Sequence, residues 1–305
     1  AVGLALVALA LLLVFIHHMG HSIQVSNIAK GIADATLAAA ENPYPSSYGD
    51  AVEAEDADAL VARWDRESPP CLVHPDEPGF VQSLDDMPET IEGRSFRVEV
   101  LVAPGDFVTA RHLIARVWTR ADRDACTKAV RRAITVAAER ELRGDVGYGV
   151  RQLADIAVKA LSPSVNDPTT ATTCIGYVQA ILERIATTPA PAPIRHYPNK
   201  DVTVVARGDT FSDYLEALVQ VSRYATSDAR AIDALLRASL RVAQAAAETG
   251  AEDRARAAGR VAARIARRAL AADAIDEEEK EAIATVLKAF PGNSHSTETD
   301  CDPSR

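Results

Sequence analysis

The most uniform hydrophobic stretch of the chain is its beginning. Residues 1–16, AVGLALVALALLLVFI, form an apolar run without a charge. A helix needs about 20 apolar residues to cross the core of a bilayer, so this run predicts a truncated transmembrane helix whose first part lies upstream. A cleaved signal peptide is the alternative, because residues 38–40 offer a small-residue site, but a basic leader is missing and the stretch between is long and polar.

The helical pattern continues beyond residue 16, with Ile23, Ile28 and Ile32 spaced among polar residues. The loop-like sequence NPYPSSYGD at 42–50 ends it. We therefore assign residues 1–42 to the truncated transmembrane helix and its soluble extension. Residues 43–70 follow as an acidic connecting helix, expected at 51–66, and a linker that contains Pro69 and Pro70.

Short alternating patterns replace the helical ones in residues 71–120. In 96–102, FRVEVLV, apolar side chains occupy every second position, as in a strand with one buried face. Pro104-Gly105-Asp106 provides a turn before the next short strand. This segment predicts a small β-rich barrel or sandwich module.

The rest of the chain is predominantly helical in pattern. Residues 121–190 predict helices at 123–142, 146–161 and 167–187, closed by a proline-rich linker. Residues 191–290 predict a strand at 201–206 and then a C-terminal helical bundle, and residues 291–305 a disordered tail. The expected fold class is thus α+β and predominantly helical.

Composition narrows the classes of function. The formal net charge of −10 argues against a nucleic-acid partner, because backbone phosphates require a basic surface. The four cysteines are too scattered to predict a disulfide framework or zinc motif, so we expect free thiols. None of the sequences GxSxG, P-loop, HExxH or GxGxxG occurs, so an enzyme is the least favoured class and no cofactor is expected.

The most distinctive candidate site lies along the helix at 146–161. This helix places polar side chains on one side, with charged residues at i, i+4 spacing. We interpret this stripe as the lining of a cleft, a subunit seam or a vestibule below a pore; the alternative is a solvated ladder of ion pairs, which would contribute little stability. The residues of the stripe are Tyr148, Arg151, Gln152, Asp155, Lys159 and Ser162.

Two further pairs of residues have both a structural and a functional interpretation. Asn166 and Asp167 precede Pro168, where Asp167 is a good N-cap, although the amides of that helix start could also receive a small ion or anionic ligand. His17 and His21, at i, i+4, could share a metal, but no third ligand is near and interfacial packing is the simpler reading.

A basic stripe follows in the C-terminal helices, at Arg260, Arg264, Arg267 and Arg268. Lipid phosphates or nucleic acid could bind such a stripe. An intramolecular match with the acidic run at 276–279 is the favoured explanation, because that run lies close by in sequence.

Residues 147–171, GYGVRQLADIAVKALSPSVNDPTTA, resemble the bacterial predicted membrane protein family catalogued as domain of unknown function 2254. Residues 15–18 with 22–24 look like the end of that family's last membrane helix, and 104–108, PGDFV, like its turn motif. The resemblance implies several further membrane helices before residue 1, in a bacterial inner membrane. It also implies an attached soluble region, expected on the cytoplasmic side, and supplies no activity.

Two functional hypotheses follow. The preferred one is a non-enzymatic, multi-pass membrane protein whose partners are the lipid bilayer and copies of itself, with the soluble region forming a homo-oligomeric collar that supports or gates transport. The alternative is a membrane-tethered sensor that binds a metal or an anionic metabolite through His17 and His21 or through the helix start at Asp167.

Overall fold

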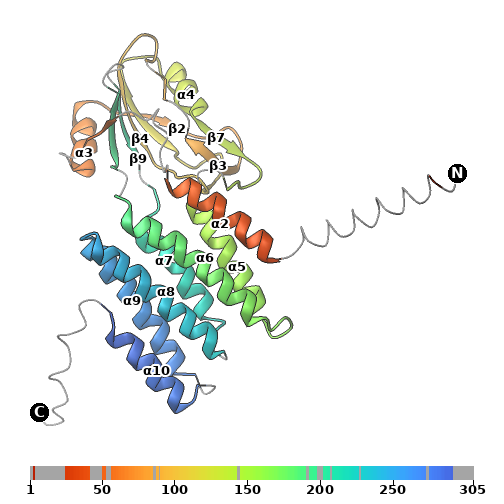
Figure 1. Cartoon of the computed structure of the whole chain (residues 1–305). Helices are drawn as coiled ribbons and strands as arrows, with labels where there is room; N and C mark the ends of the chain where they lie inside the picture. The colour runs from red at the N-terminus through yellow and green to blue at the C-terminus, as the bar shows by residue number, and fades with distance from the viewer. Residues whose placement is uncertain are drawn as a thin grey trace, which may run out of the picture. The chain divides into compact units, whose positions relative to one another are not determined.

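The computed structural model describes most of the chain beyond the apolar run (Figure 1). The described residues are residue 3 and residues 25–41, 50–52, 56–84, 87–88, 90–142, 145–189, 192–197, 202–206, 208–226, 228–272 and 275–290. Three predicted features lie outside the described residues: the transmembrane helix except for Gly3, the pair His17 and His21, and the tail at 291–305. Within the described ranges, no helix combines the length and the apolar character needed to cross a membrane.

The chain divides into two compact units. The helical unit comprises Ala1–Ala35, Gly149–Thr187 and Tyr214–Arg305, and the sheet unit comprises Thr36–Tyr148 and Thr188–Asp213. The expected α+β class with a predominance of helix is confirmed in the described residues.

The sheet unit contains two sheets. The strands of the six-stranded sheet follow the order β1 (Asp50–Ala51), β8 (Ile194–Tyr197), β9 (Val202–Ala206), β4 (Phe96–Val100), β6 (Ala115–Thr119) and β2 (Cys71–Val73). Among these strands only β4 and β9 pair in parallel, and the other neighbours pair antiparallel. The three-stranded sheet has the order β5 (Phe107–Val108), β3 (Gly79–Leu84) and β7 (Ile134–Ala137). Helices α3 (Ala57–Glu67) and α4 (Arg123–Arg132) complete the unit.

The alternation read from the sequence assigns the two faces of the larger sheet. Val98 pairs with Val117 on one side and with Val204 on the other, and all three lie in the core that the two sheets and α4 share. On the opposite face Trp118 packs with Trp64 of α3, with ring centroids 5.1 Å apart. Of the two predicted forms, the structure shows two separate sheets over one core, and neither sheet closes into a barrel in the described residues.

Two element predictions are wrong. The helix expected at 123–142 ends at Arg132, and β7 follows, because the β-branched run Ile134-Thr135-Val136 pairs with β3. The helix expected at 51–66 begins only at Ala57, where Asp56 caps it. The strand expected at 201–206 is confirmed as β9, but it pairs with β4 of the sheet unit and does not belong with the C-terminal helices.

The helical unit consists of most of α2 and of six further helices or helix segments. Their bounds are α2 (Val25–Glu41), α5 (Val146–Ala160), α6 (Pro168–Thr187), α7 (Phe211–Ser222), α8 (Ala229–Glu248), α9 (Glu252–Leu270) and α10 (Glu277–Lys288). Helix α8 packs against both α6 and α9, and α10 packs against α8 and α9. Fully buried alanines on α6, α8 and α9 allow close approach of the helices; they include Ala171, Ala238, Ala243, Ala258 and Ala262.

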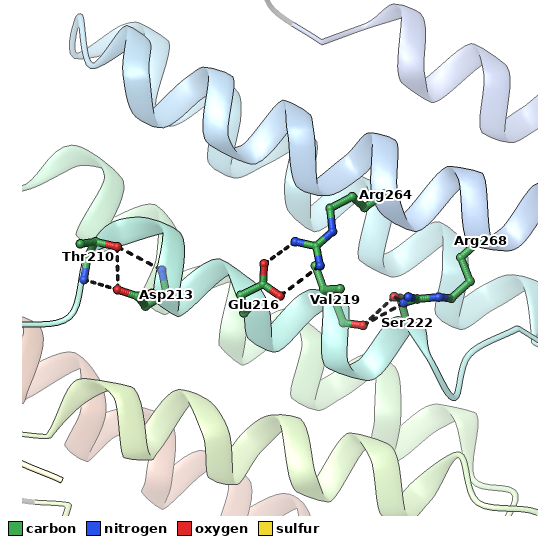
Figure 2. A network of polar contacts seen from close by, with 7 residues as sticks. All are labelled: Thr210, Asp213, Glu216, Val219, Ser222, Arg264 and Arg268. Carbon is green, nitrogen blue, oxygen red and sulfur yellow. Dashed lines mark hydrogen bonds and ion pairs between the residues drawn. The ribbon is translucent and has the colours of Figure 1, made fainter. Parts of the chain in front are cut away.

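Helices α7 and α9 are joined by polar contacts (Figure 2). Arg264 forms an ion pair with Glu216, and Arg268 Nη1 donates to Ser222 Oγ at 2.7 Å and to the Val219 carbonyl at 3.3 Å. The predicted match of this stripe with the acidic run at 276–279 is therefore wrong for these two arginines. Their partners belong to α7, because α9 lies alongside it, while Asp276 and Glu279 form the capping box of α10.

Candidate functional site

The predicted polar stripe lies on α5, whose other side is core. Leu153, Ala154 and Ala157 are buried, whereas Arg151, Asp155 and Lys159 are exposed and Gln152 is half-buried. Helix α5 therefore has two faces. Its apolar face packs in the core, and its charged face is exposed and does not contribute to that packing.

The charged residues of the stripe do not form the ladder that their spacing allows. Asp155 Oδ1 accepts a hydrogen bond from Gln220 Nε2 of α7 at 2.8 Å. In the described part of the chain, Asp155 makes no ion pair with Arg151 or Lys159. The cations at 151 and 159 thus remain exposed without a carboxylate partner there.

Tyr148 belongs to a different cluster, within the sheet unit. Its backbone N–H donates to Asp145 Oδ1 at 2.7 Å, and the guanidinium of Arg140 lies 4.7 Å from the centre of its ring. Arg140 Nε donates to Asp145 Oδ2 at 2.7 Å, and Asp145 is only 3% exposed. The structure therefore places Tyr148 beside a buried ion pair.

Gly105 fixes the approach of the PGD turn to this ion pair. Its φ of +94° is a left-handed value that favours glycine. A Cβ at this position would lie 2.2 Å from Arg140 Nη2 and 2.2 Å from Asp145 Oδ2, so a side chain does not fit. Sequence reasoning missed Arg140 and Asp145; an acidic residue directly before the helix at 146 was the available signal.

Negative charge gathers around the same ion pair. Burial of the Asp209 carboxyl, together with the nearby carboxylates of Asp145, Asp213 and Asp106, raises the pKa of Asp209, although the residue as a whole is exposed. Arg140 opposes this effect. Its guanidinium is therefore the counter-charge of the cluster.

Asp167 acts as the cap of α6. Its Oδ1 accepts from the backbone N–H of Thr170 at 3.0 Å and its Oδ2 from the hydroxyl of Thr170 at 2.5 Å, and these bonds lower the pKa of the carboxyl. Asn166 before it has φ +47°, a conformation that asparagine tolerates. Because a carboxylate already occupies the helix start, an anionic ligand would meet like charge there.

The remaining candidates concern metal and thiol chemistry. His17 and His21 lie outside the described residues. Within the ranges that the structure covers, no group of three or more His, Cys, Asp or Glu side chains is arranged to hold a metal ion. Cys71, Cys126 and Cys174 are free and buried, as expected for these three.

Comparison with known proteins places the chain in a family. Residues 1–240 match the family described as "Predicted membrane protein (DUF2254)". The chain belongs to this family. The match includes the apolar run, the PGD turn and the whole α5–α6 motif, so the resemblance read from these motifs is confirmed.

The chain is also similar to two mycobacterial proteins that are named as uncharacterized. The chain is 29% identical over 248 residues to Uncharacterized protein Mb1321c of Mycobacterium bovis and likewise to Uncharacterized protein Rv1290c of Mycobacterium tuberculosis. The alignments cover 78% of this chain and 46% of each relative, so the chain spans about half the length of the curated relatives it matches. No solved structure matches it.

Proposed function

We propose that the chain is the extramembrane part, with an adjoining membrane segment, of a multi-pass protein of the bacterial inner membrane. In this proposal the two units lie on the cytoplasmic side and form a non-enzymatic, homo-oligomeric collar that supports or gates transport. Membership of a predicted membrane protein family and the apolar run at 1–16 support the membrane attachment.

The main support for the proposed collar is a pair of exposed cations on α5 that form no ion pair in the described residues. Arg151 and Lys159 are eight positions apart on one side of the helix, hence about 12 Å apart along its axis. Both are exposed, and neither has a carboxylate partner in the described residues. In a chain with a net charge of −10, such a pair of cations is a natural contact for an acidic surface of another copy.

A complementary acidic surface exists on α10 of the same unit. Glu278 and Glu281 are exposed, three positions apart and therefore on one side of the helix. Neither is in an ion pair within the described residues. A contact between α5 of one copy and α10 of the next joins two different surfaces, and such a head-to-tail contact closes into a ring when the rotation permits.

The mass of the full chain in detergent, measured by light scattering, tests this proposal. We expect a defined oligomer for the wild type. The double variant Arg151→Glu/Lys159→Glu should shift it toward the monomer, because it sets four carboxylates against one another at each contact. Adding Glu278→Lys/Glu281→Lys to that variant should restore the oligomer, because the negative charge then lies on α5 and the positive charge on α10, so the two surfaces again attract each other.

The matched control is Arg123→Glu/Lys128→Glu on α4, which changes the net charge equally at two exposed positions of the sheet unit. It should leave the mass unchanged. A monomeric wild type at concentrations of tens of micromolar, or equal effects of the α5 and α4 variants, would remove the support for the collar.

A further inference from the structure

Exposed apolar side chains of the helical unit gather at helix ends. Of the eight large hydrophobic residues that are exposed in the described chain, five belong to this unit: Val25, Ile28, Val165, Tyr224 and Leu270. Val25 and Ile28 lie in the first turn of α2, Val165 follows α5, Tyr224 follows α7, and Leu270 ends α9. Tyr224 is 52% exposed and Val165 50% exposed.

Contacts between the helices place these ends at the same side of the unit. The pairs Glu216–Arg264 and Ser222–Arg268 show that α7 and α9 run in the same direction. Arg254, near the start of α9, donates to the carbonyls of Ile185 and Ala186 at the end of α6. The start of α6 is therefore at the end of the unit where α7 and α9 finish, and Figure 1 shows the first turn of α2 pointing the same way.

The link to the apolar run limits how far this end can lie from a bilayer. Eight residues, 17–24, separate the apolar run from Val25, and the nine residue-to-residue steps from Ile16 to Val25 span at most about 32 Å when fully extended. If the apolar run is buried in lipid, the first turn of α2 lies within that distance of the lipid surface.

The chemistry at this end suits a lipid surface. Tyr224 has an apolar ring and a polar tip, the combination that is enriched at membrane interfaces. Arg223 is exposed directly before Tyr224, and exposed cations attract anionic headgroups. Single exposed apolar residues are ordinary on a protein surface; here several share one end, beside an exposed cation and next to the chain's apolar run.

We infer that this end of the helical unit rests on the lipid bilayer, with Val25, Ile28, Val165 and Tyr224 in the headgroup region and Arg223 facing lipid phosphates. This inference rests on the membrane attachment proposed above and adds which surface meets the lipid. The bilayer is thus a second contact for the unit besides the apolar run.

Leu270 serves as an internal comparison, because an acidic run follows it in the chain, although the last turn of α9 itself carries Arg267 and Arg268. The four residues 276–279, which begin α10, are Asp276 and three glutamates, and they repel an anionic lipid surface. Helix α9 packs with α8 and α10, whereas Lys30 of α2 lies near Tyr177 of α6. Leu270 therefore lies on the side of the unit away from α2, and we place it outside the lipid contact.

Site-specific fluorescence quenching in vesicles tests the inference. Single cysteines replace Val165, Tyr224, Leu270 or Glu248 in the full chain carrying Cys301→Ser, and each is labelled with bimane. The native thiols interfere little because they are buried, and burial raises the pKa of Cys126 to about 12 and of Cys174 to about 11. The vesicles contain phosphatidylcholine and phosphatidylglycerol, with or without a nitroxide-labelled lipid near the headgroup.

We expect the nitroxide lipid to reduce emission roughly twofold or more at 165 and 224, because interfacial groups lie within about 5–10 Å of the headgroup boundary. Emission at 270 and at 248, which ends α8, should change little. Equal emission loss at all four positions, or none at 165 and 224, would overturn the inference.

Flotation of the same vesicles tests the membrane attachment separately from the choice of lipid-facing surface. If the chain floats with the vesicles but 165 and 224 are not quenched, the lipid-facing surface is wrong and the membrane attachment stands. If the chain does not float, the proposed attachment itself fails. A Val25→Cys variant repeats the test at α2, and circular dichroism of each labelled variant verifies its fold.

Discussion

The two units of the chain build their interiors from different chemistry. Among the described residues, the buried carboxylates are those of Glu99 and Asp145, and both belong to the sheet unit. Glu99 forms an ion pair with Arg116 at 2.6 Å, and Asp145 forms one with Arg140 at 2.7 Å. The helical unit instead buries alanines, and its buried polar residues are Ser222 and Ser239, whose hydroxyls donate to backbone carbonyls. The sheet unit thus depends on matched charges, and the helical unit on close approach of helices.

The largest effect should come from leaving a charge unpaired in the sheet unit. Arg140→Met removes the partner of Asp145 and should cost about 3–5 kcal/mol, the range for a buried pair that loses one member. Urea unfolding followed by tryptophan fluorescence measures this, because Trp64 and Trp118 both lie in that unit. Adding Asp145→Asn should recover part of the loss, and a cost below about 1 kcal/mol would contradict a role of charge matching here.

The corresponding perturbation of the helical unit is steric. Ala258→Leu adds a large side chain at a fully buried position of α9 and should cost about 1–3 kcal/mol by overpacking. Helical circular dichroism during urea unfolding measures it. The control, Ala284→Leu at an exposed position of α10, should stay within about 0.5 kcal/mol of the wild type; equal costs would show that close packing does not limit this unit.

Smaller losses of unfolding free energy are expected when the polar contacts between α7 and α9 in the helical unit are removed. Arg268→Met removes the hydrogen bonds to Ser222 and Val219 and should cost about 1–2 kcal/mol. Arg264→Met removes an ion pair whose partners are each about half-exposed, and should cost less than about 1 kcal/mol. The same denaturation assay compares them, and the reverse order of the two costs would refute this ranking.

The smallest effects concern two aspartates whose pKa values shift in opposite directions. The pKa of Asp209 in the sheet unit is raised, so its ionisation costs stability as pH rises toward neutral, and Asp209→Asn should stabilise at pH 7. The pKa of Asp167 in the helical unit is lowered, so its charge stabilises at neutral pH, and Asp167→Asn should destabilise there.

The Asp209 difference should shrink as pH falls from that residue's raised pKa toward the ordinary aspartate value of about 3.9, whereas the Asp167 difference should shrink only as pH falls below that value toward its lowered pKa. Urea midpoints at pH 7 and pH 3 measure them. Differences of the same sign for the two variants at pH 7 would show that the local hydrogen bonds and neighbouring carboxylates do not set these shifts.

Local sequence signals predicted much of the fold. The alternation at 96–100 gave the faces of β4, and the cap at Asp167 gave the start of α6. The helix expected at 123–142 failed because Ile134 to Ala137 pair with β3, 50 to 57 residues earlier in the chain, and a local pattern does not contain that partner. The same limit applies to β9, whose neighbour is β4.

The candidate site was predictable only in part. Residue spacing put Arg151, Asp155 and Lys159 on one side of α5, as the structure has them. It did not reveal that Gln220 of α7 would bind Asp155, or that Arg140 and Asp145 would meet Gly105. These contacts join segments that are distant in sequence, so only the folded chain shows them.

The account depends most on lipid burial of the apolar run at 1–16. Extraction of bacterial membranes with alkaline carbonate measures it directly, because this treatment strips proteins held by polar contacts and leaves those embedded in hydrocarbon. We predict that the chain stays in the membrane pellet, and that it is released when Leu11, Leu12 and Val14 are all replaced by Asp. Release of the unaltered chain would contradict both the membrane attachment and the collar built upon it.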